Sequence, residues 1–183
     1  MTSAIVIGDG PAGLSAALFL AKNGVETTVF GQDNTAMHWA ELHNYLGIPK
    51  IGGTEFQEVA RGQVQAMGAA LRADEISSVE AVDGGFRVAT AGGGQQDASF
   101  VVIAEGKSAK LAKAMGLAMN DDGVEVDREF RTAVDGLYVV GRATRVGRSQ
   151  AIISAGQGAT AAIDILSRLK GADFRDFDEP PKE

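Results

Sequence analysis

Cysteine is absent from this 183-residue sequence, which excludes disulfide bonds, thiolate nucleophiles, cysteine-ligated metals and a dithiol redox relay. Histidine is almost as scarce, because His38 and His43 are the only two, and no acidic cluster surrounds them. We therefore predict no metal site. Positive charge is in deficit as well, with 17 lysines and arginines against 24 acidic residues, so the sequence offers little electrostatic support for nucleic-acid binding.

Long apolar runs are also lacking. No stretch approaches 18 consecutive apolar residues, and no basic segment precedes the first apolar run, so we predict neither a membrane span nor an export signal and expect a cytoplasmic protein. The length fits one domain. We assign residues 1–172 to that domain and residues 173–183 to an acidic, proline-containing tail.

Glycine, by contrast, is abundant, with 24 residues, and three of them form a G-x-G-x-x-G pattern at Gly8, Gly10 and Gly13. An apolar segment, 4–7, precedes the pattern and a helix-prone segment, 14–21, follows it, which predicts a strand, a tight turn and a helix. Gly8 allows the turn, Gly10 lets the backbone approach a pyrophosphate, and Gly13 lets the helix pack closely on the strand. The pattern therefore predicts a dinucleotide site with its phosphates at the helix N-terminus.

A second strand, 25–30, follows the helix stop at Asn23 and Gly24 and completes a βαβ unit. An acidic residue is expected near the end of that strand, against the ribose hydroxyls. Asp33 has a suitable spacing for this role. Alternatively, Asp33 is a turn residue and the ribose is held by the backbone and by Gln32.

The rest of the chain predicts more α/β structure, with strands set between helices. We expect helices at 54–70 and 150–169, an antiparallel meander between 71 and 100, a buried parallel strand at 100–103, a short strand at 123–127 and a final parallel strand at 136–140. Small residues recur along the last helix, which indicates that its backbone approaches another element closely.

Five motifs of this chain resemble, in the same order, the FAD-domain motifs of the thioredoxin reductase family. They lie at 7–17 (IGDGPAGLSAA), 44–47 (NYLG), 101–106 (VVIAEG), 138–141 (YVVG) and 150–158 (QAIISAGQG). The resemblance covers nearly the whole chain. It implies an α/β fold, namely a Rossmann-like FAD-binding domain whose parallel sheet is crossed by a three-stranded β-meander.

The resemblance also implies which residues bind FAD. The pyrophosphate would lie against Gly8, Gly10, Pro11, Ala12 and Gly13; the adenosine against Gly31, Gln32 and Ile76; the flavin and its ribityl chain against Asn44, Ala104, Glu105, Gly106, Gly141, Arg142, Gln150, Ala151 and Ile152. The contact of Ala151 with the flavin also has a physical reason. A helix that begins at Ala151 would direct its N–H groups and its positive dipole end at the negative charge of reduced flavin.

The chain departs from the family in ways that matter for function. The family's NADPH domain, with its redox-active cysteine pair, would fall between the strands ending near Ala104 and Gly141, where this chain has about thirty residues and no second glycine pattern. Thioredoxin reduction by this chain alone is therefore excluded. Glu105 stands where the family has threonine, and Arg142 stands where it has an aspartate that accepts ribityl hydrogen bonds. We predict that these two side chains pair with each other, or that Arg142 turns to a phosphate.

These observations lead to one hypothesis and two alternatives. The first is a single-domain FAD oxidoreductase, reduced by NAD(P)H or by a protein partner, and dimeric as FAD domains of this family commonly are. The second is a noncatalytic or partner-dependent flavin module, and the third is a domain that binds NAD or another adenine nucleotide without flavin. No general acid or base is identified, although His38, Trp39, His43 or Tyr45 could form a wall over the flavin ring.

Overall fold

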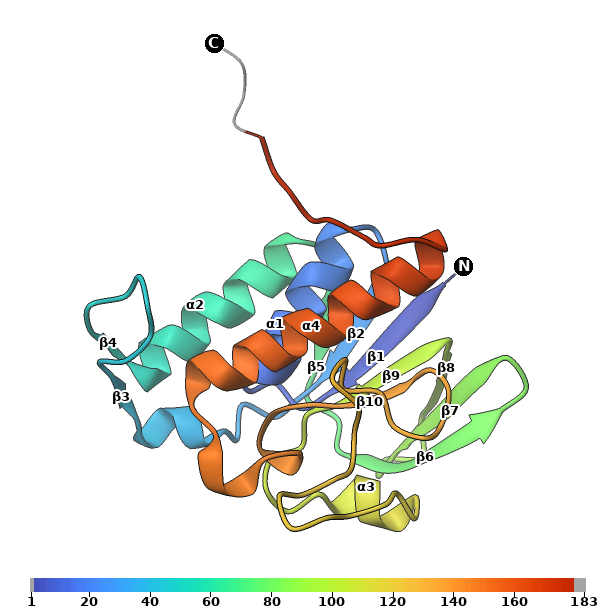
Figure 1. Ribbon diagram of the computed structural model, residues 1–183. Coiled ribbons are helices and arrows are strands. Elements are labelled where there is room, and N and C mark those ends of the chain that lie inside the picture. Colours follow the sequence, from blue (N-terminus) through green and yellow to red (C-terminus); the bar gives the residue numbers. More distant parts are fainter. Residues whose placement is uncertain (1, 180–183) are drawn as a thin grey trace.

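Five parallel strands form the central sheet of the computed structural model, which describes residues 2–179 (Figure 1). Their order across the sheet is β10–β9–β1–β2–β5. The bounds are β1 (Ser3–Ile7), β2 (Glu26–Phe30), β5 (Ala70–Arg72), β9 (Phe100–Ile103) and β10 (Leu137–Val139). The predicted α/β class and parallel sheet are thus confirmed.

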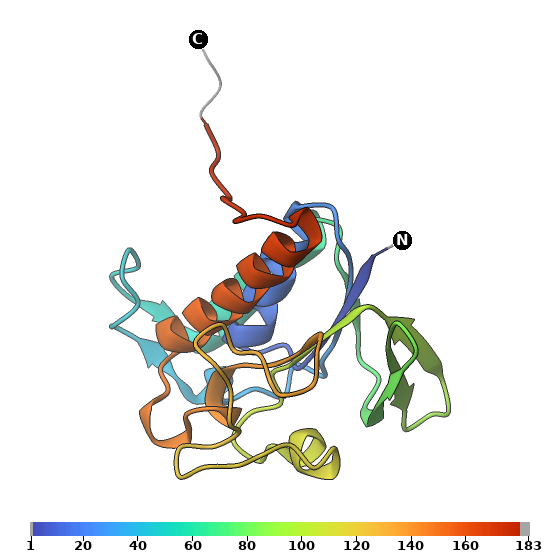
Figure 2. The ribbon, with the colours of Figure 1, turned by 45° about the vertical axis from the view of Figure 1, so that its right-hand side comes forward.

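Three helices cover one face of this sheet, as Figure 2 shows: α1 (Pro11–Lys22), α2 (Gly53–Ala66) and α4 (Ala151–Lys170). Alternate strand residues such as Val6, Val29 and Val102 point into this layer and are fully buried among the helices. Helices α1 and α4 pack closely, because a Cβ on Gly158 would overlap the carbonyl oxygen of Ala12. The small residues predicted to permit such an approach therefore do so at this position.

The opposite face of the sheet carries the predicted meander, which connects β5 to β9. It consists of β6 (Ile76–Val82), β7 (Gly85–Thr90) and β8 (Gln95–Ala98), paired antiparallel. The strand residues that alternate with these point to the opposite face. Ile5 and Ile103, for example, are buried against Phe86 and Val88 of the meander. Each strand of the sheet centre is therefore buried on both faces, which explains its continuous apolar sequence.

The short elements lie mostly at the carboxyl ends of the parallel strands. They are β3 (Glu41–Leu42), β4 (Ile51–Gly52), α3 (Lys110–Ala114) and three 3-10 turns, η1 (Ala36–Trp39), η2 (Gly141–Ala143) and η3 (Val146–Arg148). In open α/β sheets this edge is where ligands bind. The loops after β1, β2, β9 and β10 therefore gather at one place.

Two details of the chain differ from expectation. Residues 123–127 form no strand, because Val124 makes only an isolated bridge with Met119. Conversely, the sequence pattern does not predict the edge strand β5, because its three residues carry no apolar run. The helix α4 ends at Lys170 with Gly171 in the left-handed conformation. The chain then packs back on the domain, with Phe174 against the core and Asp176 paired with Lys22, before it runs away from it (Figure 1). Residues 180–183 of the predicted tail lie outside the described residues.

Candidate functional site

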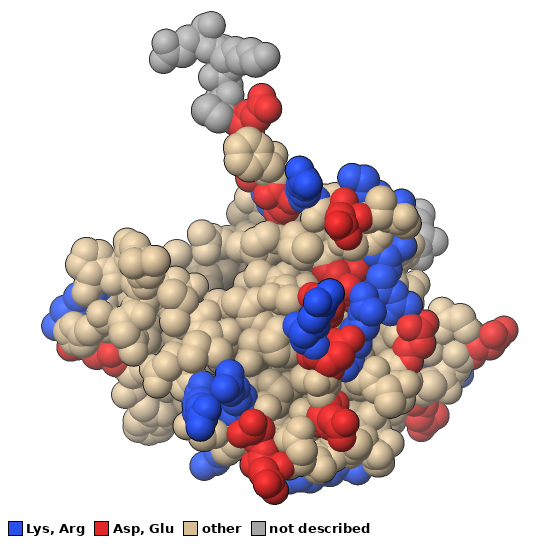
Figure 3. Space-filling model, viewed as in Figure 1, with Lys and Arg blue, Asp and Glu red and all other residues tan. Residues whose placement is uncertain are grey.

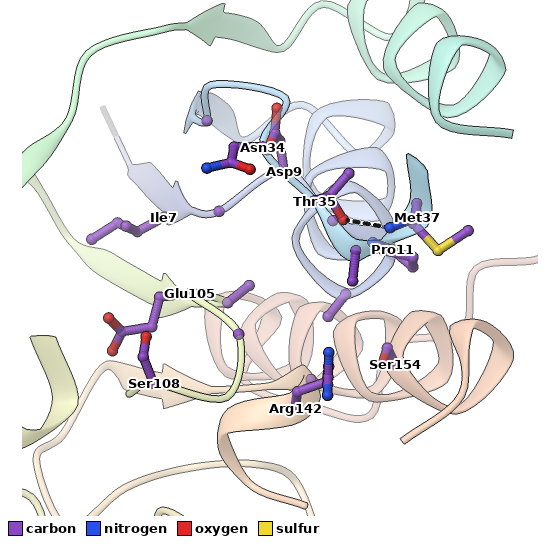
Figure 4. A pocket seen from close by; sticks show the side chains of 18 of the residues that line it. Ile7, Asp9, Pro11, Asn34, Thr35, Met37, Glu105, Ser108, Arg142 and Ser154 are labelled. Carbon is purple, nitrogen blue, oxygen red and sulfur yellow. Dashed lines mark hydrogen bonds between the residues drawn. The ribbon is translucent and has the colours of Figure 1, made fainter. Parts of the chain in front are cut away.

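A cleft of about 1220 Å³ runs along the carboxyl edge of the parallel sheet (Figure 4). It extends from the turn after β1 past the ends of β2 and β9 to the start of α4. Typical small-molecule pockets measure roughly 300–1,000 Å³, so this cleft suits a long ligand such as a dinucleotide. Fourteen of the seventeen residues predicted to bind FAD line it: Gly8, Gly10, Pro11, Ala12, Gly31, Gln32, Ile76, Ala104, Glu105, Gly106, Gly141, Arg142, Gln150 and Ala151.

The three pattern glycines hold the turn at one wall of the cleft. Gly8 has φ of +107°, and a Cβ there would overlap the carbonyl oxygen of Ala104. Gly13 lies behind the cleft, where a Cβ would overlap the carbonyl oxygen of Gly8. Gly10 differs, because a Cβ on it would meet only Thr35 Oγ1, at 3.4 Å, so this residue faces open space. Of the three glycines, only Gly10 thus leaves the space of its missing side chain open to a ligand, as a phosphate cradle requires.

The N-terminus of α1 opens on the cleft directly after this turn. Its N-cap, Gly10, has no side chain to accept a hydrogen bond, and Pro11 occupies the first helical position. The backbone N–H of Leu14 is the first to be satisfied within the helix, by the carbonyl of Gly10. The N–H groups of Ala12 and Gly13 are therefore left for an anion.

A buried carboxylate that sequence reasoning did not single out stands in the same turn. Asp9 is 5% exposed, and it forms an ion pair with Arg61 of α2 and accepts a hydrogen bond from the backbone N–H of Asp33 at 2.9 Å. Gln57, also from α2, donates to the carbonyl oxygen of Asp9. Gly31 is required beside it, because a Cβ at this position would overlap the Asp9 side chain. Asp9 thus ties together the turn, the loop after β2 and α2.

Asp33 acts as a turn residue in this arrangement. It adopts φ of +55°, it is not among the residues lining the cleft, and its backbone is bound to Asp9 and to His38. Gln32 lines the cleft instead. Of the two alternatives for the ribose, the geometry favours backbone and Gln32.

The predicted pair between Glu105 and Arg142 is wrong. The carboxylate of Glu105 accepts hydrogen bonds from the backbone N–H groups of Leu111 and Ala112, at 2.9 and 3.1 Å, and so caps the short helix α3. Figure 4 shows its side chain directed toward Ser108, whereas Arg142 points into the cleft. If the carboxylate paired with Arg142 instead, these two N–H groups of α3 would lose their acceptor. The two hydrogen bonds therefore keep the carboxylate at the helix.

The start of α4 forms the other end of the cleft. Its N-cap, Gln150, makes no side-chain cap, so the N–H groups of the first turn point outward without a side-chain acceptor. The helix begins at Ala151, as predicted. Asn44 and Ile152 do not line the cleft. Asn44 nevertheless lies beside it, because its Nδ2 donates to Gln150 Oε1 at 3.1 Å.

No residue of the predicted wall lines the cleft. Trp39 is 91% exposed, and His43 Nε2 is hydrogen-bonded to Glu41 Oε1 at 2.7 Å. Met37, Ala40 and Leu42 line this side instead. Sequence could not separate these neighbours, because the 3-10 turn η1 decides which of them face inward.

Helix α4 is anchored to the sheet by a buried polar network. Tyr138 of β10 donates to Asp164 of α4 at 2.6 Å, and Arg131 pairs with the same carboxylate. Burial and the bond to Asp164 raise the pKa of Tyr138 to about 12. Burial alone would raise the pKa of Asp164, but the hydrogen bonds from Arg131 and Tyr138 hold it below its ordinary value. This network fixes the helix whose N-terminus closes the cleft.

The residues of the cleft fit FAD by three observations. Bare backbone is exposed at Gly10, the two helix N-termini of α1 and α4 present N–H groups without side-chain caps, and the guanidinium group of Arg142 points into the cleft without an ion pair within residues 2–179. Each is a donor suited to phosphate or carbonyl oxygens. Within the same residues, no group of three or more acidic or histidine side chains could hold a metal ion.

Comparison with known proteins bears on the same site. Residues 41–159 match the family model described as pyridine nucleotide-disulphide oxidoreductase, and residues 1–39 match the model described as FAD binding domain. The two matches together cover the glycine-rich turn and the strand ends that line the cleft. They indicate FAD as the cofactor of this chain.

Thioredoxin reductases are among the relatives found by sequence. The chain is 26% identical over 172 residues to thioredoxin reductase from Rickettsia conorii, covering 90% of this chain and 51% of that protein. It is 34% identical over 116 residues to the bifunctional thioredoxin reductase/thioredoxin from Mycobacterium leprae, covering 61% of this chain and 25% of that protein. The chain thus spans about half or less of the length of these relatives.

Solved structures agree on the fold. A thioredoxin reductase from Gloeobacter violaceus superposes with a TM-score of 0.87 at 18% identity, covering 97% of this chain and 98% of that chain. An atypical thioredoxin reductase from Desulfovibrio vulgaris Hildenborough gives 0.83 at 20% identity, covering 93% and 99%. At these identities the likeness concerns the fold.

Proposed function

The chain belongs to the pyridine nucleotide-disulphide oxidoreductase family, and from this premise we propose that it works as a flavoprotein in which FAD is the sole redox centre. It is a thioredoxin reductase-like FAD-binding oxidoreductase domain. The absence of cysteine removes the dithiol through which a thioredoxin reductase would pass its electrons on. Electrons therefore enter and leave through the flavin itself.

The single-domain organisation is part of this proposal. Between β9 and β10, where a nicotinamide domain would be inserted, residues 104–136 contain one short helix, α3. We assign residues 1–172 to the FAD domain and the residues after them to a tail. The donor is then NAD(P)H bound in the open cleft or a reduced protein partner.

The residues of the cleft divide the binding task among them. The turn at Gly8 and Gly10 and the N-terminus of α1 bind the pyrophosphate, and the N-terminus of α4 at Ala151 directs its N–H groups at the flavin. Bound FAD supplies hydride and electron transfer, which no side chain here can perform. The positive end of the α4 dipole would stabilise negative charge on the reduced ring.

One observation carries the proposal: two helices without side-chain caps, α1 and α4, begin at separate places along one long cleft. A mononucleotide would need one such end. A dinucleotide with a negatively charged centre and a second polar end uses both, and the cleft has the length for it.

The visible absorption spectrum of the purified protein tests this function. Flavin bands, with FAD released on heat denaturation, are the expected result. Bleaching of those bands by NADH or NADPH alone would identify a nicotinamide-dependent enzyme, whereas bleaching only by dithionite would identify a partner-dependent module. A colourless protein that takes up no added FAD would overturn the proposal in favour of an adenine-nucleotide domain.

A specific feature of the surface favours the partner-dependent module as the second candidate. Five large apolar side chains are exposed on the elements next to the α4 end of the cleft, namely η1, the β3–β4 loop, η3 and the first turn of α4, and we name them the mouth patch: Trp39, Leu46, Val146, Ile152 and Ile153. Figure 3 shows an area of uncharged residues reaching from β3 and β4 across the first turns of α4. Exposed apolar groups gathered beside a site mark an interaction surface.

The charge beside the mouth patch indicates what kind of partner fits. Arg145 and Arg148 are exposed on either side of Val146, and neither forms an ion pair within the described residues. The chain as a whole carries a net charge of −7, so this local excess of arginine is unusual in it. An acidic electron-carrier protein would complement these arginines and bring its redox centre to the flavin end of the cleft.

Dimerisation and a cytoplasmic location complete the proposal. FAD domains similar to this one are commonly dimeric, and sedimentation analysis of the purified protein would show a mass of two chains. None of the helices within residues 2–179 has the length and apolar character to cross a membrane. Fractionation of cells expressing the tagged chain would test the location.

A further inference from the structure

Arg142 is one of two cationic side chains that line the cleft, the other being Lys110. Arg142 Nε is buried and has no hydrogen-bond partner within residues 2–179, and the side chain forms no ion pair there. A buried donor without a partner is costly, and more so when it is charged. The rest of the guanidinium group points into the cleft (Figure 4), so the arginine is arranged for an acceptor that an occupant of the cleft would supply.

The backbone that carries Arg142 is held on both sides. The N–H of Gly141 donates to Gln157 Oε1 of α4 at 2.6 Å, and Thr144 Oγ1 donates to the carbonyl of Gly141 at 3.0 Å. Gln157 and Thr144 are themselves buried. The turn η2 therefore presents Arg142 in a fixed position, which lowers the conformational entropy lost when a ligand binds.

That position is next to the N-terminus of α1. A Cβ on Gly141 would lie 3.0 Å from the Cβ of Ala12, the second residue of the helix. Figure 4 shows the guanidinium group pointing into the cleft on the side of Pro11 and Ser154. Arg142 thus enters the cleft where the glycine-rich turn and the uncapped helix leave their N–H groups for phosphate.

We propose that Arg142 binds the pyrophosphate of FAD with its guanidinium fork, opposite the N-terminus of α1. The inference rests on the proposed function. It adds a specific ligand group for Arg142, which stands where the family has an aspartate that would accept hydrogen bonds. Arginine cannot accept a hydrogen bond, and its planar fork matches two phosphate oxygens. With arginine in place of aspartate, the side chain at this position therefore contacts an anion instead of a hydroxyl donor.

The position of Glu105 makes this assignment possible. Its carboxylate follows the strand adjacent to β10, but the N–H groups of Leu111 and Ala112 hold it at α3. Glu105 therefore does not neutralise Arg142. The two unusual charges of the cleft have separate tasks, one capping a helix and the other binding the ligand.

The test measures binding of FAD and of ADP to the flavin-free full chain by titration calorimetry. ADP carries the adenosine and the pyrophosphate but neither ribityl chain nor flavin, so it isolates the proposed contact. Arg142→Gln should weaken both ligands by about tenfold to a hundredfold, as expected for loss of a charge-assisted hydrogen bond. Arg142→Lys, which keeps the charge but not the fork, should give a smaller loss for both.

The control is Arg128→Gln, an exposed arginine whose side chain is 92% accessible and which lies outside the cleft. It should change neither affinity by more than about twofold. Circular dichroism and a melting curve show that each variant is folded, and Arg142→Lys keeps the test decisive should Arg142→Gln fail to fold.

The outcomes separate this inference from the proposed function. Loss of FAD affinity with unchanged ADP affinity would place Arg142 on the ribityl chain or the flavin and overturn the inference, as would unchanged affinity for both. If the wild-type chain binds ADP but not FAD, the proposed function fails. The pyrophosphate assignment would survive that result when Arg142→Gln still loses ADP.

Discussion

The guanidinium group of Arg61, in α2, pairs with the carboxylate of Asp9 in the middle of the glycine-rich turn. Asp9 is nearly inaccessible, and its charge stands in a turn that would bind a pyrophosphate. Left alone, this carboxylate would repel the ligand and be costly to bury. Arg61 removes both difficulties, and the backbone N–H of Asp33 completes the environment of the carboxylate.

Replacing Arg61 with alanine should therefore destabilise the protein by about 3–5 kcal/mol, because it leaves a buried charge without its partner. The double variant Asp9→Asn with Arg61→Ala should recover part of the loss, because the charge is then gone as well. Urea denaturation monitored by circular dichroism measures these differences. The matched control is Arg87→Ala, which breaks the exposed pair with Asp97 and should cost less than about 1 kcal/mol. Equal costs for the two arginines would contradict the role given to Asp9.

The glycines of the turn should respond differently to alanine. Gly8→Ala places a Cβ against the carbonyl of Ala104 at a positive φ, so the protein should lose stability before any ligand is considered. Gly10 has φ of −75°, and a Cβ there would have its nearest neighbour at 3.4 Å, so the fold should tolerate Gly10→Ala. The new methyl group faces the cleft, however, and should lower FAD affinity by tenfold or more, measured by flavin retention and titration. A Gly10→Ala variant that binds FAD normally would exclude close contact of the ligand with this turn.

Sequence reasoning succeeded where the pattern encodes a backbone contact directly. The spacing of Gly8, Gly10 and Gly13 reports where two backbones meet, and the structure places carbonyl oxygens at the first and last of these positions. The small residues of the last helix worked in the same way, with Gly158 against Ala12. Such contacts constrain one residue type at one position, so a single sequence can reveal them.

It failed where the outcome depends on competition between partners. Glu105 and Arg142 follow adjacent strands, as expected, but the prediction did not weigh the free N–H groups of α3, which compete with the arginine for the carboxylate. Nor does any local pattern connect Asp9 with Arg61, 52 residues later, because their meeting depends on how α2 packs on the sheet. A carboxylate inside the glycine pattern is nevertheless a signal that a cation must lie nearby.

The stability of the protein should fall between pH 10 and pH 12 because of Tyr138. Folding raises the pKa of this phenol from 10.0 to about 12, so the folded state favours the protonated form. Its contribution is complete below pH 10 and is lost as the pH rises toward 12, a change of about 3 kcal/mol at 1.36 kcal/mol per pKa unit. Urea denaturation at successive pH values should show a steeper decline for wild type than for Tyr138→Phe. The sequence has two tyrosines, so in a Tyr45→Phe background the tyrosinate absorbance reports Tyr138 alone. A midpoint near 10 there would contradict the prediction.

Reversing the charge of the two arginines beside the mouth patch should slow electron transfer from an acidic carrier without affecting the flavin. Arg145 and Arg148 are exposed beside Val146 and would meet the acidic surface of such a carrier, so Arg145→Glu with Arg148→Glu should lower the rate of flavin reduction by a reduced acidic iron–sulphur protein by tenfold or more at low salt. The difference should shrink as ionic strength rises, because exposed charges are screened within about 8 Å at 0.15 M salt.

The comparison needs a variant that changes the net charge elsewhere, and Arg128→Glu serves, since this arginine is exposed and outside the cleft. Trp39→Ala tests the mouth patch itself and should slow the same reduction at all salt concentrations, because the variant lacks the indole, 91% exposed in the free chain, that would contact the carrier. Dithionite should reduce every variant as fast as wild type. If Trp39→Ala instead halves the mass in solution and leaves the reduction rate unchanged, the patch joins two copies of this chain and the carrier docks elsewhere. If the arginine variant and Arg128→Glu slow the reaction equally, net charge alone steers the encounter and the local arginines have no special role.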